Sequence, residues 1–137
     1  MSRIVSVTRV AHFNAAHRLH NPDWSAEKNA EVFGLCNNPS FHGHNYELHL
    51  TVRGAVDEGT GYVMDMKEIK DILEAEVLSK FDHRNLNLDV PAFKNVNPTA
   101  ENIAVVIWDI MRPFVPADFE LSVKLYETPR NYVEFNG

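Results

Sequence analysis

Residues 42–54 show the pattern that most limits the folds open to this chain, because two kinds of side chain alternate there without interruption. One set of alternate positions is mainly apolar and begins with two histidines: His42, His44, Tyr46, Leu48, Leu50 and Val52. The other set is small, polar or charged: Gly43, Asn45, Glu47, His49, Thr51 and Arg53. A period of two residues is typical of a strand with one buried face. The sequence therefore predicts a half-buried strand whose inner face begins with a pair of imidazoles.

Other segments are predicted to join this strand in a sheet. Residues 4–13 are rich in Val and Thr, and residues 121–128 and 132–135 form two strand-like segments at the end of the chain. Residues 57–61 read as a turn, after which residues 62–64 are predicted to return as a short strand. A sheet of four main strands has two open edges, which favours pairing with another chain.

Two long helices are predicted between the second and third main strands. Apolar residues at helical spacing place them over residues 65–80 and 100–111. Asp65 supplies an N-cap for the first, and the sequence 97–99, Asn-Pro-Thr, opens the second. A shorter helix is expected over residues 25–33. The order ββααββ predicts an α+β domain with an antiparallel four-stranded sheet and two helices on one face.

Composition limits the compartment and the partners. The 137 residues carry a net charge of −6 and no apolar run that approaches the ~20 residues of a membrane span. This balance provides no general basic field for nucleic acid or membrane phosphate. The chain has one cysteine and no signal-peptide pattern at its start, so nothing indicates an oxidising compartment. We expect a single cytoplasmic domain, residues 1–137, with neither nucleic acid nor membrane as a partner.

The histidine pair is a candidate metal site. Residues two apart on a strand point the same way with Cα atoms ~6.5–7 Å apart, so His42 and His44 can converge on one ion. Zinc held by three protein nitrogens, with its fourth position open, is the catalytic arrangement. His17 follows the first strand and can supply the third nitrogen, but the spacing leaves other histidines open: His12, His20, His49 and His83. From residue chemistry alone, a zinc site and an ordinary pair of strand histidines both remain open.

Two further features have acid–base character. Cys36 lies six residues before His42 in a turn sequence, Cys-Asn-Asn-Pro, and is either a small buried residue or a thiol whose pKa the metal site lowers. Asp82 and His83 follow the first long helix, where a carboxylate can orient an imidazole, although adjacent side chains often point apart. The pair is therefore either a proton relay or a helix-end motif.

Glu127 continues the apolar face formed by Leu121, Val123 and Leu125 on the predicted strand 121–128. A carboxylate at the end of such a row either reaches solvent at the rim of the sheet or receives hydrogen bonds in a pocket. In a pocket, it suits the N–H and NH₂ donors of a guanine-like or pterin ring. Both interpretations remain open from the pattern alone.

Taken together, these motifs resemble the 6-pyruvoyltetrahydropterin synthase / 6-carboxytetrahydropterin synthase family. The resemblance extends in order over nearly the whole chain, and its most specific part is Cys-x5-His-Gly-His. The segments that carry it are Phe13–Leu19 (FNAAHRL), Cys36–Tyr46 (CNNPSFHGHNY), Leu78–Leu86, Pro98–Asn102 and Tyr126–Thr128. It implies the tunnelling fold (T-fold), in which three ββααββ subunits close a barrel and two trimers stack into a homohexamer.

The resemblance also implies the site. It places Zn²⁺ on His17, His42 and His44, makes Cys36 the catalytic base, and makes Asp82 and His83 a proton relay supplied by a neighbouring subunit. Glu127 becomes the pterin anchor, with three further residues around the pterin pocket: Thr99, Glu101 and Thr128. The active sites then lie at subunit interfaces.

The implied reaction is that of a zinc-dependent carbon–oxygen lyase. It converts 7,8-dihydroneopterin triphosphate to 6-pyruvoyltetrahydropterin with loss of triphosphate, as in tetrahydrobiopterin biosynthesis. Arg18, Lys28 and Arg84 are candidates to meet the triphosphate, and the sequence does not choose among them.

Three alternatives remain. A 6-carboxytetrahydropterin synthase of the queuosine pathway uses the same substrate but releases acetaldehyde. Forms of it often have three residues between the cysteine and His-Gly-His, so the five in this chain favour the pyruvoyl product. A zinc hydrolase would use a metal-bound hydroxide and need no Cys36. A non-catalytic pterin- or purine-binding oligomer would need Glu127 but not the histidines.

Overall fold

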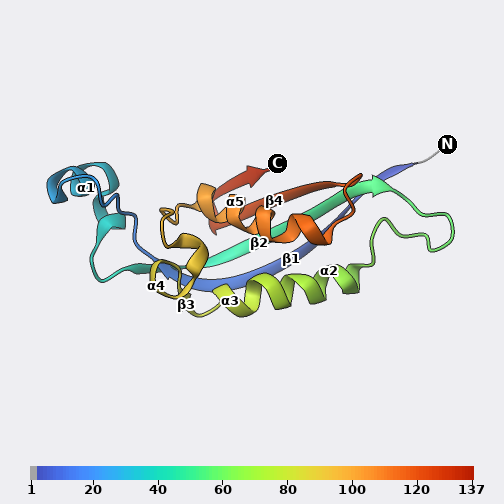
Figure 1. Cartoon of the computed structure of the whole chain (residues 1–137), viewed down its shortest axis with the longest axis horizontal. Helices are drawn as coiled ribbons and strands as arrows, with labels where there is room; N and C mark the ends of the chain where they lie inside the picture. Colours follow the sequence, from blue (N-terminus) through green and yellow to red (C-terminus); the bar gives the residue numbers. More distant parts are fainter. Residues whose placement is uncertain (1–2) are drawn as a thin grey trace.

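The computed structural model describes residues 3–137 and is built on one mixed sheet of five strands in the order β3-β1-β2-β4-β5. The strands are β1 (Ile4–His17), β2 (His42–Ala55), β3 (Arg84–Asn85), β4 (Glu120–Thr128) and β5 (Asn131–Phe135). The long strands β1 and β2 run antiparallel along most of the length of the molecule, and α1 lies beyond one end of them (Figure 1). β4 and β5 continue the antiparallel pairing on the far side of β2.

The prediction of a four-stranded antiparallel sheet therefore lacks one strand of the observed sheet. A fifth strand, β3, pairs in parallel with β1 at Ala15 and Ala16. β1 also extends beyond its predicted end at Phe13 to His17, because the segment 14–17 continues to pair with β2. A two-residue parallel strand leaves no periodic signal in a sequence, which is why it was not predicted.

The short strand predicted at Tyr62–Met64 is wrong. This segment is a bend and turn that follows an Asx turn, in which the Asp57 side chain accepts hydrogen bonds from the backbone N–H groups of Gly59 and Thr60. Val63 is buried against the core from this loop. The apolar side chain of Val63, which favoured a strand, therefore packs into the core from a loop.

The helices form at the predicted places and begin at the predicted caps. The main ones are α1 (Ala26–Phe33), α2 (Met66–Leu73) and α5 (Ala100–Met111), with side-chain caps from Ser25, Asp65 and Thr99. The predicted helix 65–80 contains a π-helical segment, η2 (Glu74–Leu78), before the short α3 (Ser79–Phe81). Short turns complete the chain: η1 (Gly34–Asn37), α4 (Leu86–Asp89), η3 (Pro91–Phe93) and η4 (Arg112–Phe114).

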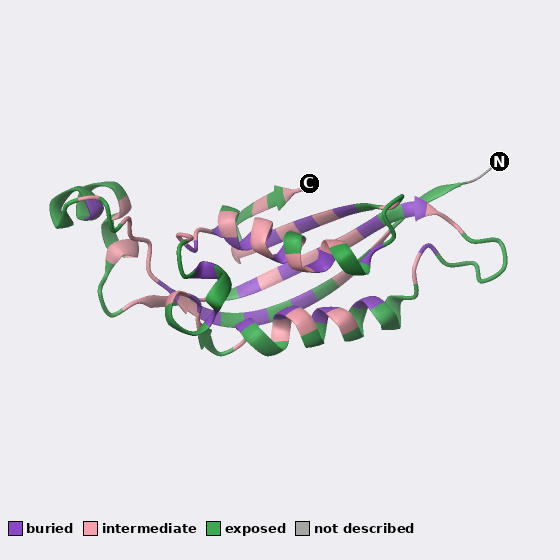
Figure 2. Ribbon diagram, in the orientation of Figure 1, coloured by how far each residue is buried: buried purple, intermediate pink, exposed green. Residues whose placement is uncertain are grey.

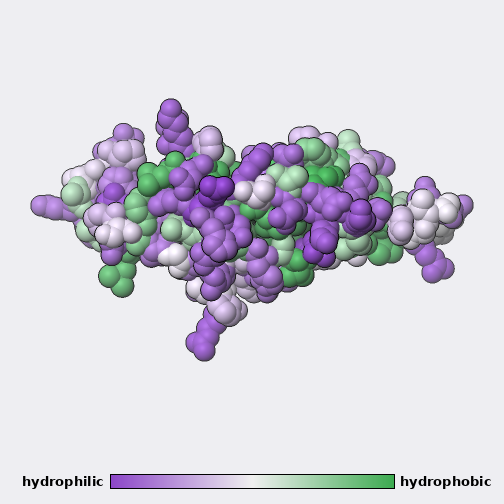
Figure 3. Space-filling model, turned by 90° about the horizontal axis from the view of Figure 1, so that it is seen from below, coloured by the Kyte–Doolittle hydropathy of each residue, from purple (hydrophilic) through white to green (hydrophobic). Residues whose placement is uncertain are grey.

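One hydrophobic core lies between one face of the sheet and the two long helical segments. α2 packs over β1, and α5 packs over β4 and β5. Buried residues alternate along the strands, and α2 buries only the stripe that faces the sheet (Figure 2). On the side of the molecule where α2 lies in Figure 1, polar and apolar residues are mixed on the surface (Figure 3). No helix within residues 3–137 combines the length and apolar character needed to cross a membrane.

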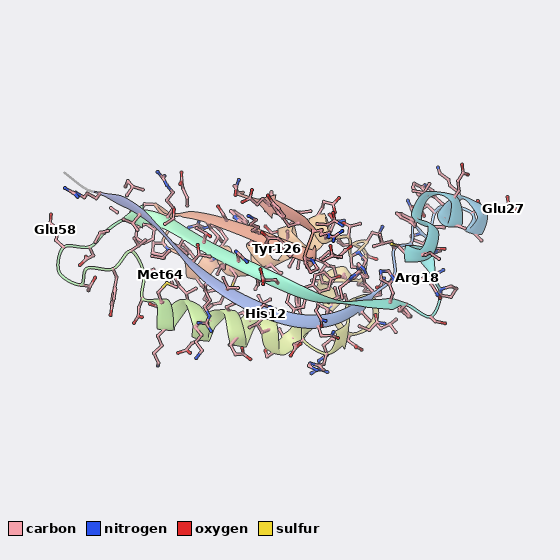
Figure 4. All side chains as sticks on the ribbon, turned by 180° about the vertical axis from the view of Figure 1, so that it is seen from behind. His12, Arg18, Glu27, Glu58, Met64 and Tyr126 are labelled. Atoms are coloured by element: carbon pink, nitrogen blue, oxygen red, sulfur yellow. The ribbon has the colours of Figure 1, made fainter. Side chains whose placement is uncertain are left out.

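No helix within residues 3–137 lies over the opposite face of the sheet, which is polar. Figure 4 shows this face, with His12 and Tyr126 on it. Thr8 and Thr51 share a hydrogen bond of 2.8 Å across β1 and β2, and His49 bonds Glu47 at 2.8 Å. The two faces of β2 therefore match the two sets of alternate residues predicted from the sequence.

Close packing at Gly54 yields a test of the fold. A Cβ atom at this position would lie 2.5 Å from Cδ1 of the Phe119 ring, so Gly54→Ala forces that ring to move. We expect a loss of about 1–3 kcal/mol in the free energy of unfolding, measured by denaturant titration. Gly43→Ala on the same strand is the control, because its Cβ would meet only the Ala15 carbonyl at 3.5 Å. Equal stability of the two variants would contradict this packing.

Candidate metal centre

Three histidines converge where β1 ends and β2 begins. His17 pairs with His42 in the sheet register, and His44 lies two residues further along the same face of β2. The ring centroids are 4.5 Å apart for His17 and His42, 5.1 Å for His17 and His44, and 5.0 Å for His42 and His44. One potential ligand atom from each residue lies within 4.8 Å of the others. The register of two strands thus builds the cluster.

Four ring nitrogens of this cluster have no hydrogen-bond partner among residues 3–137. Within residues 3–137, Nε2 of His17, both ring nitrogens of His42 and Nε2 of His44 are buried and accept or donate no hydrogen bond. Leaving a buried polar atom unpaired costs on the order of 1–3 kcal/mol, so several such atoms in one cluster indicate a site that binds a ligand. Three imidazole nitrogens fit a metal ion with an open coordination position.

His17 is oriented for this role by its second nitrogen. Its Nδ1–H donates to the carbonyl oxygen of Pro98 at 2.7 Å, which leaves Nε2 with a lone pair directed into the cluster. The Tyr46 hydroxyl lies 3.4 Å from the same Nδ1. Burial, together with the neighbouring His42 and His44, lowers the pKa of His17 to about 4 despite the Pro98 hydrogen bond. His17 is therefore neutral at pH 7, as a metal ligand must be.

His42 and Glu127 complete the immediate surroundings. Burial, followed by the nearby His44, lowers the pKa of His42, and Glu127 opposes this shift. Glu127 Oε1 lies 3.8 Å from His44 Nε2, and the Glu127 side chain is 28% exposed. The carboxylate therefore stands at the edge of the histidine cluster, partly open to solvent, where it can meet a ligand.

Cys36 lies in η1, on the loop that connects α1 to β2, and its side chain is half-buried. The Leu19 N–H donates to the Cys36 carbonyl at 2.9 Å, which ties this loop to the chain just after His17. Phe41, the last residue of the loop, has φ 68°, a left-handed conformation that bulky residues rarely adopt. The loop therefore enters β2 through a strained residue immediately before His42.

Asp82 and His83 do contact each other, at 3.0 Å between Oδ2 and Nδ1. Asn14 fixes the pair from β1: its N–H donates to Asp82 Oδ1 at 2.8 Å, and its carbonyl accepts from the His83 N–H at 2.6 Å. The hydrogen bond from Asn14 and the His83 contact hold the pKa of Asp82 below its usual range. His83 has φ 60°, and its side chain is 82% exposed, so the imidazole faces outward from this chain.

The other predicted pocket residues have visible local roles. Thr99 caps α5, and Thr128 accepts hydrogen bonds from the backbone of Arg130 and Asn131. Glu101 lies exposed in the first turn of α5. Within residues 3–137, no hydrogen bond joins these three side chains to the histidine cluster, so the structure leaves their pocket role untested.

A cavity of about 810 Å³ is lined in part by Pro98, whose carbonyl orients His17, but by none of the three histidines. Of the three basic residues considered from the sequence, only Arg18 lines it. Lys94, which the sequence analysis missed, lines it as well. Lys28 instead lies over the Trp24 ring at 4.2 Å, and Arg84 lines a separate hollow.

Sequence reasoning also missed the groups that hold the site in place. The Pro98 carbonyl and the backbone of Asn14 are main-chain groups, and a main-chain partner leaves no mark on residue type. Tyr46 was assigned to the apolar face of β2, and its hydroxyl near His17 could have been anticipated because it follows His44 on that face.

The fold and the centre define an α+β protein with a cluster of three histidines that could hold a metal ion. A family model described as 6-pyruvoyl tetrahydropterin synthase matches residues 6–137, and the chain belongs to this family. It is 46% identical to 6-pyruvoyl tetrahydrobiopterin synthase of Poecilia reticulata over 135 residues, covering 98% of this chain and 92% of the relative. The human enzyme of the same name is 44% identical over 131 residues, covering 96% and 90%.

The solved structure of Caenorhabditis elegans 6-pyruvoyl tetrahydropterin synthase superimposes with a TM-score of 0.94 at 39% identity, covering 99% of this chain and 97% of the other. The T-fold predicted from the sequence is thus confirmed at the level of the subunit.

Removal of a ligand tests the metal centre. His42→Ala leaves two imidazoles of the cluster, so we expect the bound zinc per chain to fall below about a tenth of the wild-type content after dialysis. Elemental analysis of the dialysed protein measures this content. His49→Ala is the matched control, because His49 lies on β2 but contacts Glu47 on the opposite face. Full zinc content in His42→Ala would contradict the assignment.

Proposed function

We propose that this chain converts 7,8-dihydroneopterin triphosphate to 6-pyruvoyltetrahydropterin, releasing triphosphate as a lyase of tetrahydrobiopterin biosynthesis. Membership of the family over nearly the full length supports this activity. The observation that carries the proposal is the cluster of buried histidine nitrogens without partners, beside a carboxylate and a thiol-bearing loop. The reaction eliminates triphosphate by an internal oxidation–reduction, so it requires no external oxidant.

His17, His42 and His44 would hold a zinc ion. When bound, zinc acts as a Lewis acid that acidifies the side-chain hydroxyls of the substrate and weakens the adjacent C–H bonds. The three imidazoles contribute no net charge when neutral, so the positive charge of the ion is preserved for this purpose. The Pro98 carbonyl keeps His17 in the tautomer that presents Nε2.

Cys36 is proposed as the base that removes a carbon-bound proton. Its half-buried position on a loop tied to the chain after His17 supports a location beside the substrate. A thiol near a cationic centre is more readily ionised, and a thiolate in place can accept a proton directly.

Asp82 and His83 are proposed to relay protons. The contact of 3.0 Å between them supports this role, because the carboxylate holds the imidazole in one orientation. The exposed side chain of His83 supports its delivery to a neighbouring subunit. Cys36 and this pair would then act on one substrate from two chains.

Glu127 is proposed to accept hydrogen bonds from the pterin ring, with Thr99, Glu101 and Thr128 lining the pocket. The position of Glu127 at the rim of the histidine cluster supports this, since a pterin held there would have its side chain close to the three histidines. Arg18 and Lys94 are proposed to meet the triphosphate, because both line the cavity beside Pro98.

We propose a homohexamer of two trimers in the cytoplasm as the working form. β3 covers only Ala15 and Ala16 on the outer edge of β1, and β5 forms the other edge of the sheet. Long strand edges are available for pairing between copies of the chain, and such pairing closes a barrel. The polar face of the sheet would then line its interior.

A second candidate is the 6-carboxytetrahydropterin product, which the same substrate and similar catalytic groups can give. The five residues between Cys36 and His42 and the identity to pyruvoyl enzymes favour the pyruvoyl product.

Cys36→Ala tests the chemical step. We expect it to retain zinc and the oligomeric state, because the thiol is not among the three nitrogen ligands, and to lose at least about a hundredfold in kcat. Zinc analysis, light scattering and steady-state turnover measure the three properties. Full activity of this variant would exclude Cys36 as the base.

Glu127→Gln tests substrate binding. The amide replaces one acceptor oxygen by a donor, so we expect KM to rise by about tenfold or more, from the loss of roughly 1.5–3 kcal/mol of charged hydrogen bonding. Glu47→Gln on the polar face of β2 is the control and should leave KM unchanged. An unchanged KM in Glu127→Gln would contradict its role as the pterin anchor.

A further inference from the structure

The loop that carries Cys36 has few means of staying in place. None of the residues of η1 is buried, and Leu35, next to the thiol, is 91% exposed. The loop therefore gains little from apolar packing, and its position must come from hydrogen bonds. A base that acts on a bound substrate requires placement within a fraction of an ångström.

The hydrogen bonds that hold this loop converge on residues 18–20, just after His17; at the last of these, Asn37 Nδ2 lies 3.0 Å from His20 Nδ1. The Leu19 N–H donates to the Cys36 carbonyl at 2.9 Å. Arg18 Nε donates to the Asn37 carbonyl at 2.8 Å, and Asn37 Nδ2 donates to the Leu19 carbonyl at 2.7 Å. Three bonds in both directions thus join the Cys36 loop to residues 18–19.

Residues 18–19 lie beyond the end of β1, where the chain leaves the sheet toward α1; Arg18 is labelled at this point in Figure 4. Asn87 in α4 forms two hydrogen bonds with the main chain of Arg18. The Arg18 N–H donates to Asn87 Oδ1 at 2.8 Å, and Asn87 Nδ2 donates to the Arg18 carbonyl at 2.9 Å. Both polar atoms of the Asn87 amide are thereby used on one residue.

We propose that Asn37 and Asn87 are positioning residues that clamp residues 18–19 between them and so set the distance of the Cys36 thiol from the histidine cluster. Residues 18–19 follow His17 directly. The side-chain amides of Asn37 and Asn87 form hydrogen bonds with main-chain groups of these residues, and the positions of main-chain groups do not vary with side-chain rotamers. This inference rests on the proposed role of Cys36 as the base. Neither amide is required to touch the substrate for the clamp to act.

The clamp predicts a specific kinetic signature. In Asn37→Ala and Asn87→Ala, we expect kcat to fall by about ten- to a hundredfold, because the base is displaced. In Asn37→Ala, KM should stay within about twofold, because the pterin anchor is not displaced. In the same zinc-loaded proteins, alkylation of Cys36 by iodoacetamide should become about threefold faster or more, since the half-buried thiol becomes more accessible. A merely structural defect would not couple these two changes.

Asn38→Ala is the matched control. Asn38 is adjacent to Asn37, but its side chain only accepts a hydrogen bond from the Ser40 N–H, so its kcat and alkylation rate should stay at wild-type values. Circular dichroism measures whether each variant folds. If Asn87→Ala does not fold, Asn37→Ala alone tests the proposal. The proposal is overturned if Asn37→Ala matches Asn38→Ala in both kcat and alkylation rate.

The two proposals fail in different ways. Full turnover by Cys36→Ala would overturn the proposed function, whereas the alkylation rates of the two clamp variants would still measure whether the amides hold the loop. Faster alkylation in both supports the clamp, and wild-type alkylation in both overturns it.

Discussion

The antiparallel register of β1 and β2 is the constraint on which the rest of the structure depends. The two strands pair over 14 residues each, from Ile4 opposite Ala55 to His17 opposite His42. A slip of one residue would turn every side chain of a strand to the other face. The same register therefore places Tyr46, Leu48 and their neighbours in the core and brings His17, His42 and His44 together. Core formation and metal binding are thus two results of one pairing.

The site combines a rigid part and a part held by hydrogen bonds. The histidines and Glu127 stand on strands β1, β2 and β4, backed by buried residues. Cys36 instead stands on a loop with no buried residue, whose place depends on main-chain contacts made by Arg18, Leu19 and Asn37. A fixed candidate metal site and a separately held loop with the proposed base suit the proposed reaction, which needs activation and proton removal at different atoms.

Much of the fold was predictable because its signals are local. Alternation in residues 42–54 and the caps at Ser25, Asp65 and Thr99 identify β2 and the three main helices. β3 and the bend at 62–64 could not be predicted in the same way. The first is too short for a period, and the apolar Val63 in the second packs into the core from a loop.

The site, too, has residues that the sequence predicts and contacts that it does not. Spacing identified His42 and His44, while His17 needed either the resemblance or the strand register to single it out from the other histidines. The Pro98 carbonyl and the Asn14 backbone were beyond prediction, because any residue type supplies a main-chain partner. Asp82 contacts His83 where the backbone of His83 is left-handed. The residue type of His83 does not predict this backbone conformation.

The most direct test of the account is the product formed by the zinc-loaded protein from 7,8-dihydroneopterin triphosphate, separated by chromatography under anaerobic conditions. We expect 6-pyruvoyltetrahydropterin and triphosphate in equal amounts, without acetaldehyde. Formation of 6-carboxytetrahydropterin with acetaldehyde, or recovery of the pterin side chain unaltered after loss of phosphate, would contradict it.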